Sequence, residues 1–568
     1  MKKPYFAYRS FWPQLEAKRQ FAELGVKQFC VFSVHSANSM GEPYCLNDPT
    51  WKWYDVYDFA PFDREVDEIL AIAPDARILC LVDLNSPLWL ARQQSVDSFP
   101  QLTCAECDDG WRLETGKYLD AFMGHAEERY GDVIDCFVLM CGFTDEWMDN
   151  SCGCASEGKF RRYRQWCRDR GLPVPEGLPS SIYSNTSLDC EEAVQYWRFH
   201  GEFNVDTILH FAAKTRNHLR PGQEIGVFYG HVLELGAISR QRSHLDYERL
   251  QQSPLIDFVI SPGDYEDRAM GGGSGFMSPN GTIHLNGKGC LYEIDHATHT
   301  GNLSPSPYAS ASFISKWKDI AEDVAGIRRE FCRTLFHGAS LWWFDMWGGF
   351  YELPEQLAAI RQCLRIWDRY ADRTFEPDAQ VALVVDPEGI LRLPATGNYL
   401  DDYHLFMPAL NSLNRLGAPY RVYSMNDLAS LPREIRLLVL VAPYAIPAEA
   451  SGRVAATRCV WCGPHGAAID GLPGTRIADV RQLTPQLLRS EAESAGVHIY
   501  IDEPCPVWAG RNLLSVHVAT GGRRVIRLPH PAKYVRELFS GGTADADGQS
   551  FSWEFSTPDT ALFEISRQ

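Results

Sequence analysis

Two glutamates follow short apolar runs, and such a pair could cleave a glycosidic bond. Residues 133–140 lead to Glu146, and residues 290–292 lead to Glu293. Glycoside hydrolysis uses two carboxyl groups, one as general acid and one as nucleophile or base. A lone glutamate at a strand end more often forms an ion pair or a helix cap. Glu146 and Glu293 are therefore catalytic candidates only if the fold brings them to the same site.

Apolar runs alternate with amphipathic stretches, which predicts parallel strands separated by helices. Helical patterns cover 63–73, 118–130, 190–219 and 315–336. Seven apolar runs precede residue 350, at 28–34, 78–82, 133–140, 224–229, 256–260, 289–292 and 340–344. A closed (β/α)8 barrel needs one more, and we expect it, as the third strand, within 95–117. In such barrels chemistry occurs at the C-terminal ends of the strands.

Two further domains are predicted after the barrel, which we assign to residues 1–374. Apolar strand-like runs at 381–385, 420–423, 437–441 and 458–462 predict a flavodoxin-like α/β domain over residues 375–484. Short runs at 497–501, 513–518, 524–528, 551–555 and 561–565, separated by Gly, Pro and Asp, predict a small β-sandwich over residues 485–568.

The composition of the chain limits which partners it could bind and in which compartment it could lie. The net charge of −19 argues against a nucleic-acid partner. The sequence contains no run of about 20 apolar residues, so no membrane span is expected. No apolar segment follows the N-terminal lysines, so no signal peptide is expected. An odd count of 17 cysteines without such a signal favours reduced thiols in the cytoplasm.

Several segments together resemble the family-42 β-galactosidases. They are residues 256–262, Asp264-Tyr265 with Arg268, residues 287–295 and residues 342–349. The order of barrel, α/β domain and β-domain is also similar. The resemblance implies that Glu146 is the acid/base after the fourth strand and that Glu293 is the nucleophile at the end of the seventh. It further implies a retaining, exo-acting β-glycosidase that needs no catalytic cofactor, and a homotrimer formed through the middle domain.

One residue departs from the resemblance. The related families carry Asn directly before the acid/base, where its amide contacts the sugar 2-hydroxyl, and here this residue is Asp145. An ionised carboxylate accepts a hydrogen bond but cannot donate one, and its charge would raise the pKa of Glu146. The departure favours a sister family with altered recognition at the 2-position, such as the family-164 β-mannosidases.

Other polar and aromatic residues close to the predicted strand ends are candidates for contact with an oligosaccharide or glycoside substrate. With Asp145 they are Asp83, Asn85, His231, Tyr265, Arg268, Asp295, Trp343 and Trp347. Since neighbouring strand residues face opposite sides, Trp342, Trp343 and Trp347 cannot all face a sugar, and at least one should point into the helices.

Four cysteines form two close pairs, Cys104/Cys107 and Cys152/Cys154. Thiolate tetrads suit structural zinc, and some family-42 enzymes have a four-cysteine zinc site beside the loop after the acid/base. The spacing is not the usual two-knuckle pattern, so free thiols are the alternative.

The Gly-rich segment 271–275 lacks the Lys-Ser/Thr of a phosphate-binding loop and favours a flexible substrate loop. A clan relative acting on β-mannosides, β-glucuronides or β-glucosides remains an alternative. A barrel that binds carbohydrate without catalysis is another, although the presence of both glutamates speaks against it.

Overall fold

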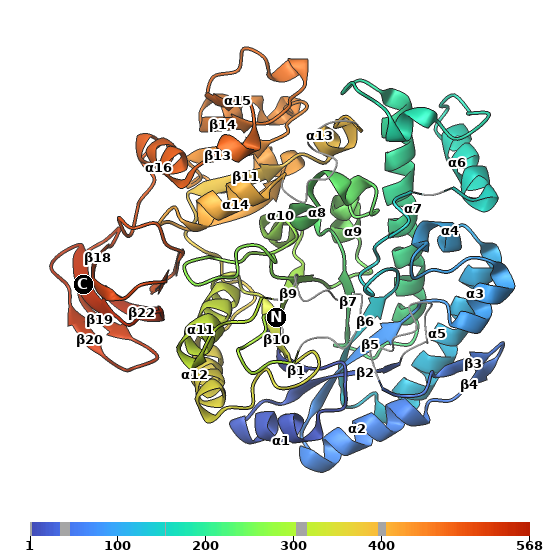
Figure 1. Ribbon diagram of the computed structural model, residues 1–568, viewed down its shortest axis with the longest axis horizontal. Helices are drawn as coiled ribbons and strands as arrows, with labels where there is room; N and C mark the ends of the chain where they lie inside the picture. Colours follow the sequence, from blue (N-terminus) through green and yellow to red (C-terminus); the bar gives the residue numbers. More distant parts are fainter. Residues whose placement is uncertain (1–2, 35–45, 154, 303–314, 396–404, 568) are drawn as a thin grey trace.

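The computed structural model describes residues 3–34, 46–153, 155–302, 315–395 and 405–567. Eight parallel strands form a closed barrel in the order β1-β10-β9-β8-β7-β6-β5-β2, which confirms the predicted (β/α)8 fold (Figure 1). The barrel strands are β1 (Phe6–Arg9), β2 (Gln28–Val34), β5 (Arg77–Asp83), β6 (Ile134–Met140), β7 (Glu224–Phe228), β8 (Phe258–Pro262), β9 (Gly289–Ile294) and β10 (Ser340–Phe344).

The strand missing from the sequence prediction is the first, not the third. β1 has only four residues, all buried, so it shows no periodicity. The region 95–117 instead contains α4 (Leu102–Glu106) and the start of α5 (Asp109–Tyr130). Asp108 caps α5 by accepting a hydrogen bond from the Trp111 backbone. Residues 28–34 and 78–82 are therefore the second and third strands. The runs before Glu146 and Glu293 remain the fourth and seventh.

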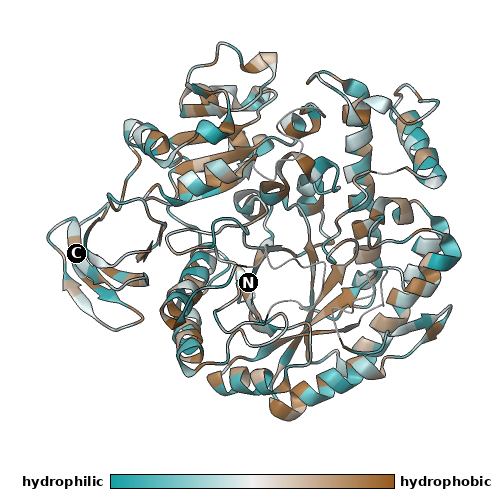
Figure 2. Cartoon of the chain, in the orientation of Figure 1, coloured by the Kyte–Doolittle hydropathy of each residue, from teal (hydrophilic) through white to brown (hydrophobic). Residues whose placement is uncertain are grey.

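Helices surround the barrel and turn polar faces outward, as the hydropathy colours show (Figure 2). They are α1 (Leu15–Leu24), α2 (Ala60–Ile72), α3 (Leu88–Gln94), α4 (Leu102–Glu106), α5 (Asp109–Tyr130), α6 (Glu157–Asp169), α7 (Glu191–Arg216), α8 (Val232–Leu235), α9 (Tyr247–Gln252), α10 (Asn280–Leu285), α11 (Ile320–Phe336) and α12 (Pro354–Tyr370). A hairpin of β3 (Trp51–Trp53) and β4 (Val56–Tyr57) precedes α2. Within the described residues, no helix has the length and apolar character needed to cross a membrane.

The middle segment forms a parallel sheet in the order β12-β11-β13-β14-β15, the flavodoxin-like arrangement. Its strands are β11 (Val381–Val385), β12 (Tyr420–Ser424), β13 (Leu437–Val441), β14 (Arg458–Cys462) and the unpredicted edge strand β15 (Thr475–Ile477). Helices α13 (Pro387–Arg392), α14 (Met407–Asn414), α15 (Ser451–Ala455) and α16 (Pro485–Ser494) accompany it. Cys459 and Cys462 are buried in β14, in agreement with a core role.

The C-terminal segment contains one five-stranded and one two-stranded antiparallel sheet over a shared core. The strands are β16 (Val507–Gly510), β17 (Leu513–Val518), β18 (Gly522–Arg527), β19 (Ala532–Glu537), β20 (Thr543–Asp545), β21 (Ser550–Phe555) and β22 (Asp559–Arg567). Residues 497–501, predicted as a strand, are irregular. Helix α16, placed in the sandwich by the predicted boundary at 485, packs against α14 of the middle segment.

Candidate active site

Glu293 lies near the C-terminal end of β9, and neighbouring strands supply its hydrogen-bond donors. Trp342 of β10 donates from Nε1 to Glu293 Oε2 over 2.8 Å, and Arg9 of β1 donates to the same oxygen. Arg9 and Glu293 are both almost fully buried. The Arg9 guanidinium lies 4.0 Å from the ring centre of Phe344 and 4.9 Å from that of Trp342. An aromatic enclosure thus orients Arg9 toward Glu293.

Glu146 lies in a tight turn directly after β6. Thr144, Asp145 and Trp147 around it have left-handed φ angles of 55°, 63° and 57°. Such angles cost non-glycine residues on the order of 1–3 kcal/mol each, and they persist where the surroundings enforce them. A strained turn at this position is typical of a functional site, where the side chain must be aimed.

Side-chain hydrogen bonds enforce this turn. Asn85 accepts from the Gly142 backbone over 2.9 Å and donates to Asp145 Oδ1 over 2.8 Å. His244 Nε2 donates to the Glu146 carbonyl over 2.9 Å. The predicted substrate residue Asn85, itself fully buried, therefore holds the turn that carries Glu146.

The two glutamates have raised and unequal pKa values. Burial raises the pKa of Glu146 to about 8, and the charges of Glu293 and Asp295 add to the effect while Thr144 opposes it. Burial also raises the pKa of Glu293 to about 7, opposed by Arg9 and by the Trp342 hydrogen bond. The expected order, with Glu146 the weaker acid, is present. Glu293 nevertheless ionises above the usual glutamate range, because burial outweighs its donors.

Asp145 and Asp83 lie beside Asn85, and all three side chains are almost fully buried. The Asn85 backbone donates to Asp83 Oδ1 over 2.8 Å. Burial, followed by the charge of Asp83, raises the pKa of Asp145 well above its usual range. A higher pKa favours the protonated form of Asp145, and a protonated carboxyl can donate a hydrogen bond as an Asn amide does. This differs from the expectation from sequence, in which Asp145 is an ionised carboxylate that can only accept a hydrogen bond.

Arg268 joins two other predicted residues. Its Nη2 lies 2.7 Å from Asp295 Oδ1, and its guanidinium lies 4.0 Å from the ring centre of Tyr265. Charges on Glu146 and Asp295 both raise the pKa of the Tyr265 hydroxyl, after burial. Among the described residues, Asp295 Oδ2 has no hydrogen-bond partner although it is buried. These three residues thus lie close to the catalytic candidates.

The structure does not bring Trp343 to this group. Its ring centre lies 5.9 Å from that of Phe6 and 5.7 Å from that of Tyr351. Phe6 in turn contacts Trp367 of α12, so Trp343 faces the helical layer. Trp342, on the opposite face of β10, takes the inner position.

Trp347 and His231 have different surroundings. Trp347 lies 5.6 Å from Phe11, beside the aromatic enclosure of Arg9. His231 is buried, and its Nε2 donates to the Ile260 carbonyl over 3.2 Å. Burial lowers its pKa to about 4, so the ring is neutral. Trp347 borders the site, whereas His231 holds the backbone of the neighbouring strand.

The sequence prediction did not include Arg9 or Glu234, and it selected Trp343 and Trp347 rather than Trp342. An arginine at the end of β1 would have been a signal, had that strand been recognised. Glu234 lies on the one-turn helix α8 after β7, and its Oε2 is buried without a hydrogen-bond partner among the described residues. Burial and then the charge of Glu146 raise its pKa well above the usual range. It is an additional carboxyl group close to Glu146.

The cysteine pairs are only partly described. Cys104 and Cys107 lie in and directly after α4, close enough to the buried Lys159 for their charges to affect its pKa. Cys152 follows the Glu146 turn, and Cys154 lies outside the described residues. In the described ranges, no group of three or more His, Cys, Asp or Glu residues could hold a metal. These residues alone do not make a zinc site, and the zinc stays a prediction.

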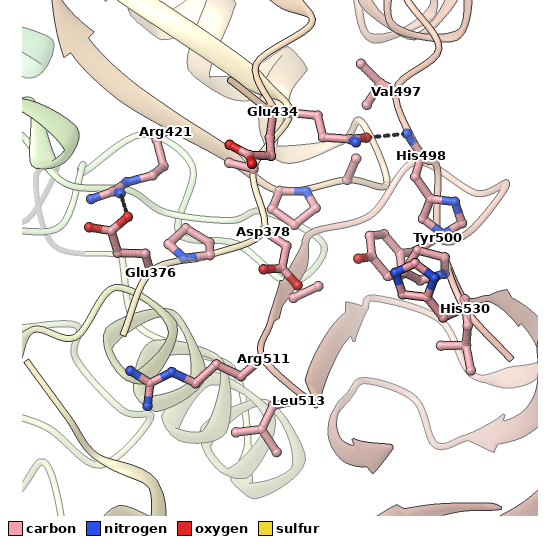
Figure 3. A pocket seen from close by; sticks show the side chains of 18 of the residues that line it. Glu376, Asp378, Arg421, Glu434, Val497, His498, Tyr500, Arg511, Leu513 and His530 are labelled. Carbon is pink, nitrogen blue, oxygen red and sulfur yellow. Dashed lines mark hydrogen bonds and ion pairs between the residues drawn. The ribbon is translucent and has the colours of Figure 1, made fainter. Parts of the chain in front are cut away.

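A cavity of about 480 Å³ lies elsewhere, where the 376–380 linker, the middle sheet and the C-terminal segment meet (Figure 3). Arg421 pairs with Glu376 at 2.9 Å there, and the His498 backbone donates to Gln380. Its lining contains none of the predicted site residues. The group around Glu146 and Glu293 therefore remains the candidate active site.

No protein-family model matches this sequence, and no curated protein matches it. Solved structures do match over the whole chain. A β-galactosidase from Bacillus circulans sp. alkalophilus is 12% identical with a TM-score of 0.68, covering 99% of both chains. A catalytic mutant of a GH42 β-galactosidase from G. stearothermophilus is 12% identical with a TM-score of 0.67, covering 100% of this chain and 99% of that chain.

A third similar structure is an exo-carrageenase GH42 from Bacteroides ovatus, 10% identical with a TM-score of 0.58. The match covers 100% of this chain and 82% of that one. The predicted likeness to family-42 enzymes is thus confirmed at the level of the fold, across all three parts of the chain. At these identities the likeness extends to proteins named for different substrates, and this chain shares its fold with them.

Proposed function

We propose that this chain is a retaining, exo-acting β-glycosidase that releases a terminal β-linked hexose of the galactoside type from oligosaccharides. The carboxyl pair supports this proposal most directly, with Glu146 after the fourth barrel strand and Glu293 near the end of the seventh. Glu146 has the higher pKa, as the general acid requires, and Glu293 is held by two donors. The fold likeness to solved β-galactosidases is consistent with it.

In the first step Glu293 attacks the anomeric carbon of the terminal sugar. Arg9 and Trp342 both donate to Oε2, so Oε1 is the nucleophilic oxygen. Protonated Glu146 gives its proton to the glycosidic oxygen as the carbon–oxygen bond breaks, and the remaining sugar leaves as an alcohol. A covalent glycosyl ester on Glu293 results.

In the second step Glu146, now ionised, removes a proton from water as the water attacks the anomeric carbon. The ester bond breaks, Glu293 is restored as a carboxylate, and Glu146 regains its proton. Two displacements at one carbon return the original β configuration.

A β-mannosidase or another β-glycosidase of the same clan is the alternative within enzymes. Asp145 favours it, because this residue lies directly before the acid/base and differs from the Asn of family-42 enzymes. A catalytically inactive carbohydrate-binding barrel is the non-enzymatic alternative. The presence of both Glu146 and Glu293 argues against it, since binding alone requires no such pair.

Hydrolysis of a panel of aryl β-glycosides that differ only in the sugar would test activity and identify the substrate. Glu293→Ala should abolish turnover, and azide should restore it with an inverted product, because a small anion can enter from the vacated side. In Glu146→Ala, aryl glycosides whose leaving group departs without acid assistance should still glycosylate Glu293. Full activity of Glu293→Ala would refute the mechanism.

The remaining expectations are proposals of the same kind. We expect a cytoplasmic homotrimer, and light scattering that gave a mass near the 64.2 kDa chain would refute the trimer. Structural zinc at Cys104, Cys107, Cys152 and Cys154 would be detected by elemental analysis of the purified protein. The proposed catalysis uses no cofactor.

A further inference from the structure

The loop after β8 carries two residues of the candidate active site, Tyr265 and Arg268. It spans residues 263–278, and we call it the β8 loop. Its neck is closed by a bridge between Gly263 and Phe276, and Asp264 stabilises its first turn by accepting from the Glu266 backbone over 2.8 Å. The position of this loop therefore determines where Tyr265 and Arg268 lie.

The middle domain holds the β8 loop through Asp267, the residue directly before Arg268. Asn414, at the end of α14, donates from Nδ2 to Asp267 Oδ2 over 2.8 Å and to the Ser274 carbonyl over 2.9 Å. Arg415 Nη2 lies 2.7 Å from Asp267 Oδ1. Asp267 is buried, so these charge-assisted bonds are shielded from water.

The C-terminal domain holds the same loop from another side. His517 of β17 accepts at Nε2 from the Gly271 backbone over 2.9 Å. Burial keeps this histidine neutral by lowering its pKa well below the usual range, so Nδ1 carries the proton and donates to Thr560 Oγ1 over 2.8 Å. Thr560 in turn donates to the Ala325 carbonyl of α11. The chain of donors fixes the tautomer that can accept from the loop.

Helix α11 completes the contacts. Arg329 donates to the carbonyls of Arg268, Ala269 and Gly272 over 2.8 to 3.0 Å. A Cβ on Gly273 would lie 2.4 Å from Asn414 Cγ, so a glycine is needed for the loop to approach α14. The Gly-rich segment, which the sequence suggested was a flexible substrate loop, instead permits close packing.

We infer that the middle and C-terminal domains are parts of the active site, with Asn414, Arg415 and His517 as positioning residues that hold Tyr265 and Arg268 toward the substrate. This inference rests on the proposed glycosidase function. Asn414, Arg415 and His517 bond to the β8 loop and not, within the described residues, to Glu146 or Glu293. Their loss should therefore affect substrate binding without changing acid–base catalysis.

Arg415→Ala is the main test, because Arg415 is partly exposed and its loss should not prevent folding. We expect KM for an aryl β-glycoside to rise about tenfold, the effect of losing one charged hydrogen bond, with kcat and the pH profile little changed. Arg436→Ala is the matched control, since Arg436 belongs to the same domain but bonds to Gly496. Arg415→Lys, which keeps the charge, should recover part of the loss.

A double-mutant cycle and hydrogen exchange separate this inference from the proposed function. If Arg415 acts through Asp267, Arg415→Ala should add little to the effect of Asp267→Asn. Amides of residues 263–278 should exchange faster in Arg415→Ala, a result that needs no enzymatic activity. Inactive wild-type protein would refute the glycosidase proposal alone. Unchanged kinetics and unchanged exchange in Arg415→Ala would refute the inference.

Discussion

The guanidinium of Arg9 and the carboxyl group of Glu293 form an ion pair in which both side chains are about 95% buried, with exposed fractions of 5% and 6%. The two residues come from the first and seventh strands of the barrel and meet inside it. A buried charge pair loses most of its hydration, and removal of one partner leaves the other unpaired. Arg9 therefore controls how readily Glu293 ionises.

We predict that Arg9→Met lowers kcat/KM by about 100-fold, the upper range for losing a hydrogen bond to a charged group. Without the cation the pKa of Glu293 rises, so the acidic limb of the pH profile should move to higher pH. Arg9→Lys should have a kcat/KM and an acidic limb between those of the wild-type protein and Arg9→Met. Arg129→Met, at an ion pair on the surface with Asp63, is the control. An unchanged acidic limb in folded Arg9→Met would contradict the role of Arg9.

The wild-type pH profile should be a narrow bell. Below about 7 Glu293 holds a proton and cannot attack, and above about 8 Glu146 loses the proton that the leaving group needs. The two groups interact, so the limbs report the pair rather than either residue alone. Glycosylation of Glu146→Ala by a substrate with an activated leaving group should lose the alkaline limb. A plateau of kcat/KM extending below pH 6 would exclude this assignment.

Asp145 should tolerate conversion to Asn. Burial and the charge of Asp83 raise the pKa of Asp145 and so favour its protonated form. Asp145→Asn preserves the one donor and one acceptor of that form and should change kcat/KM by no more than about threefold. Asp145→Ala breaks the hydrogen bond from Asn85 and should lower kcat/KM by about tenfold or more. A large loss in Asp145→Asn would show instead that the residue acts as a carboxylate.

The sequence predicted those site residues whose position depends on one strand alone. Glu146 and Glu293 each follow a short apolar run that forms a barrel strand, so the barrel brings them to the same end. Strand alternation shows that Trp342 and Trp343 face opposite sides but not which one faces inward. That choice depends on the pairing of Trp342 with Glu293 across β9 and β10, a tertiary register. The charge of Asp145 depends on burial beside Asp83, and a sequence does not display burial.

Two hydrogen bonds through the His244 ring connect the turn that carries Glu146 to the start of α8, the helix that carries Glu234. The His244 ring donates to the Glu146 carbonyl over 2.9 Å and accepts from the His231 backbone over 3.2 Å, directly before α8. This bridge places the α8 turn beside Glu146.

Burial raises the pKa of Glu234 well above its usual range, and its Oε2 is buried without a partner among the described residues. We therefore predict that Glu234 hydrogen-bonds a sugar hydroxyl. Glu234→Gln keeps a donor and an acceptor and should retain wild-type KM. Glu234→Ala should raise KM about tenfold, the cost of one hydrogen bond, while kcat falls less. Steady-state kinetics with the best aryl glycoside measures both constants. Equal losses in the two variants would mean that the carboxylate charge is required, and no change in Glu234→Ala would remove the residue from the substrate site.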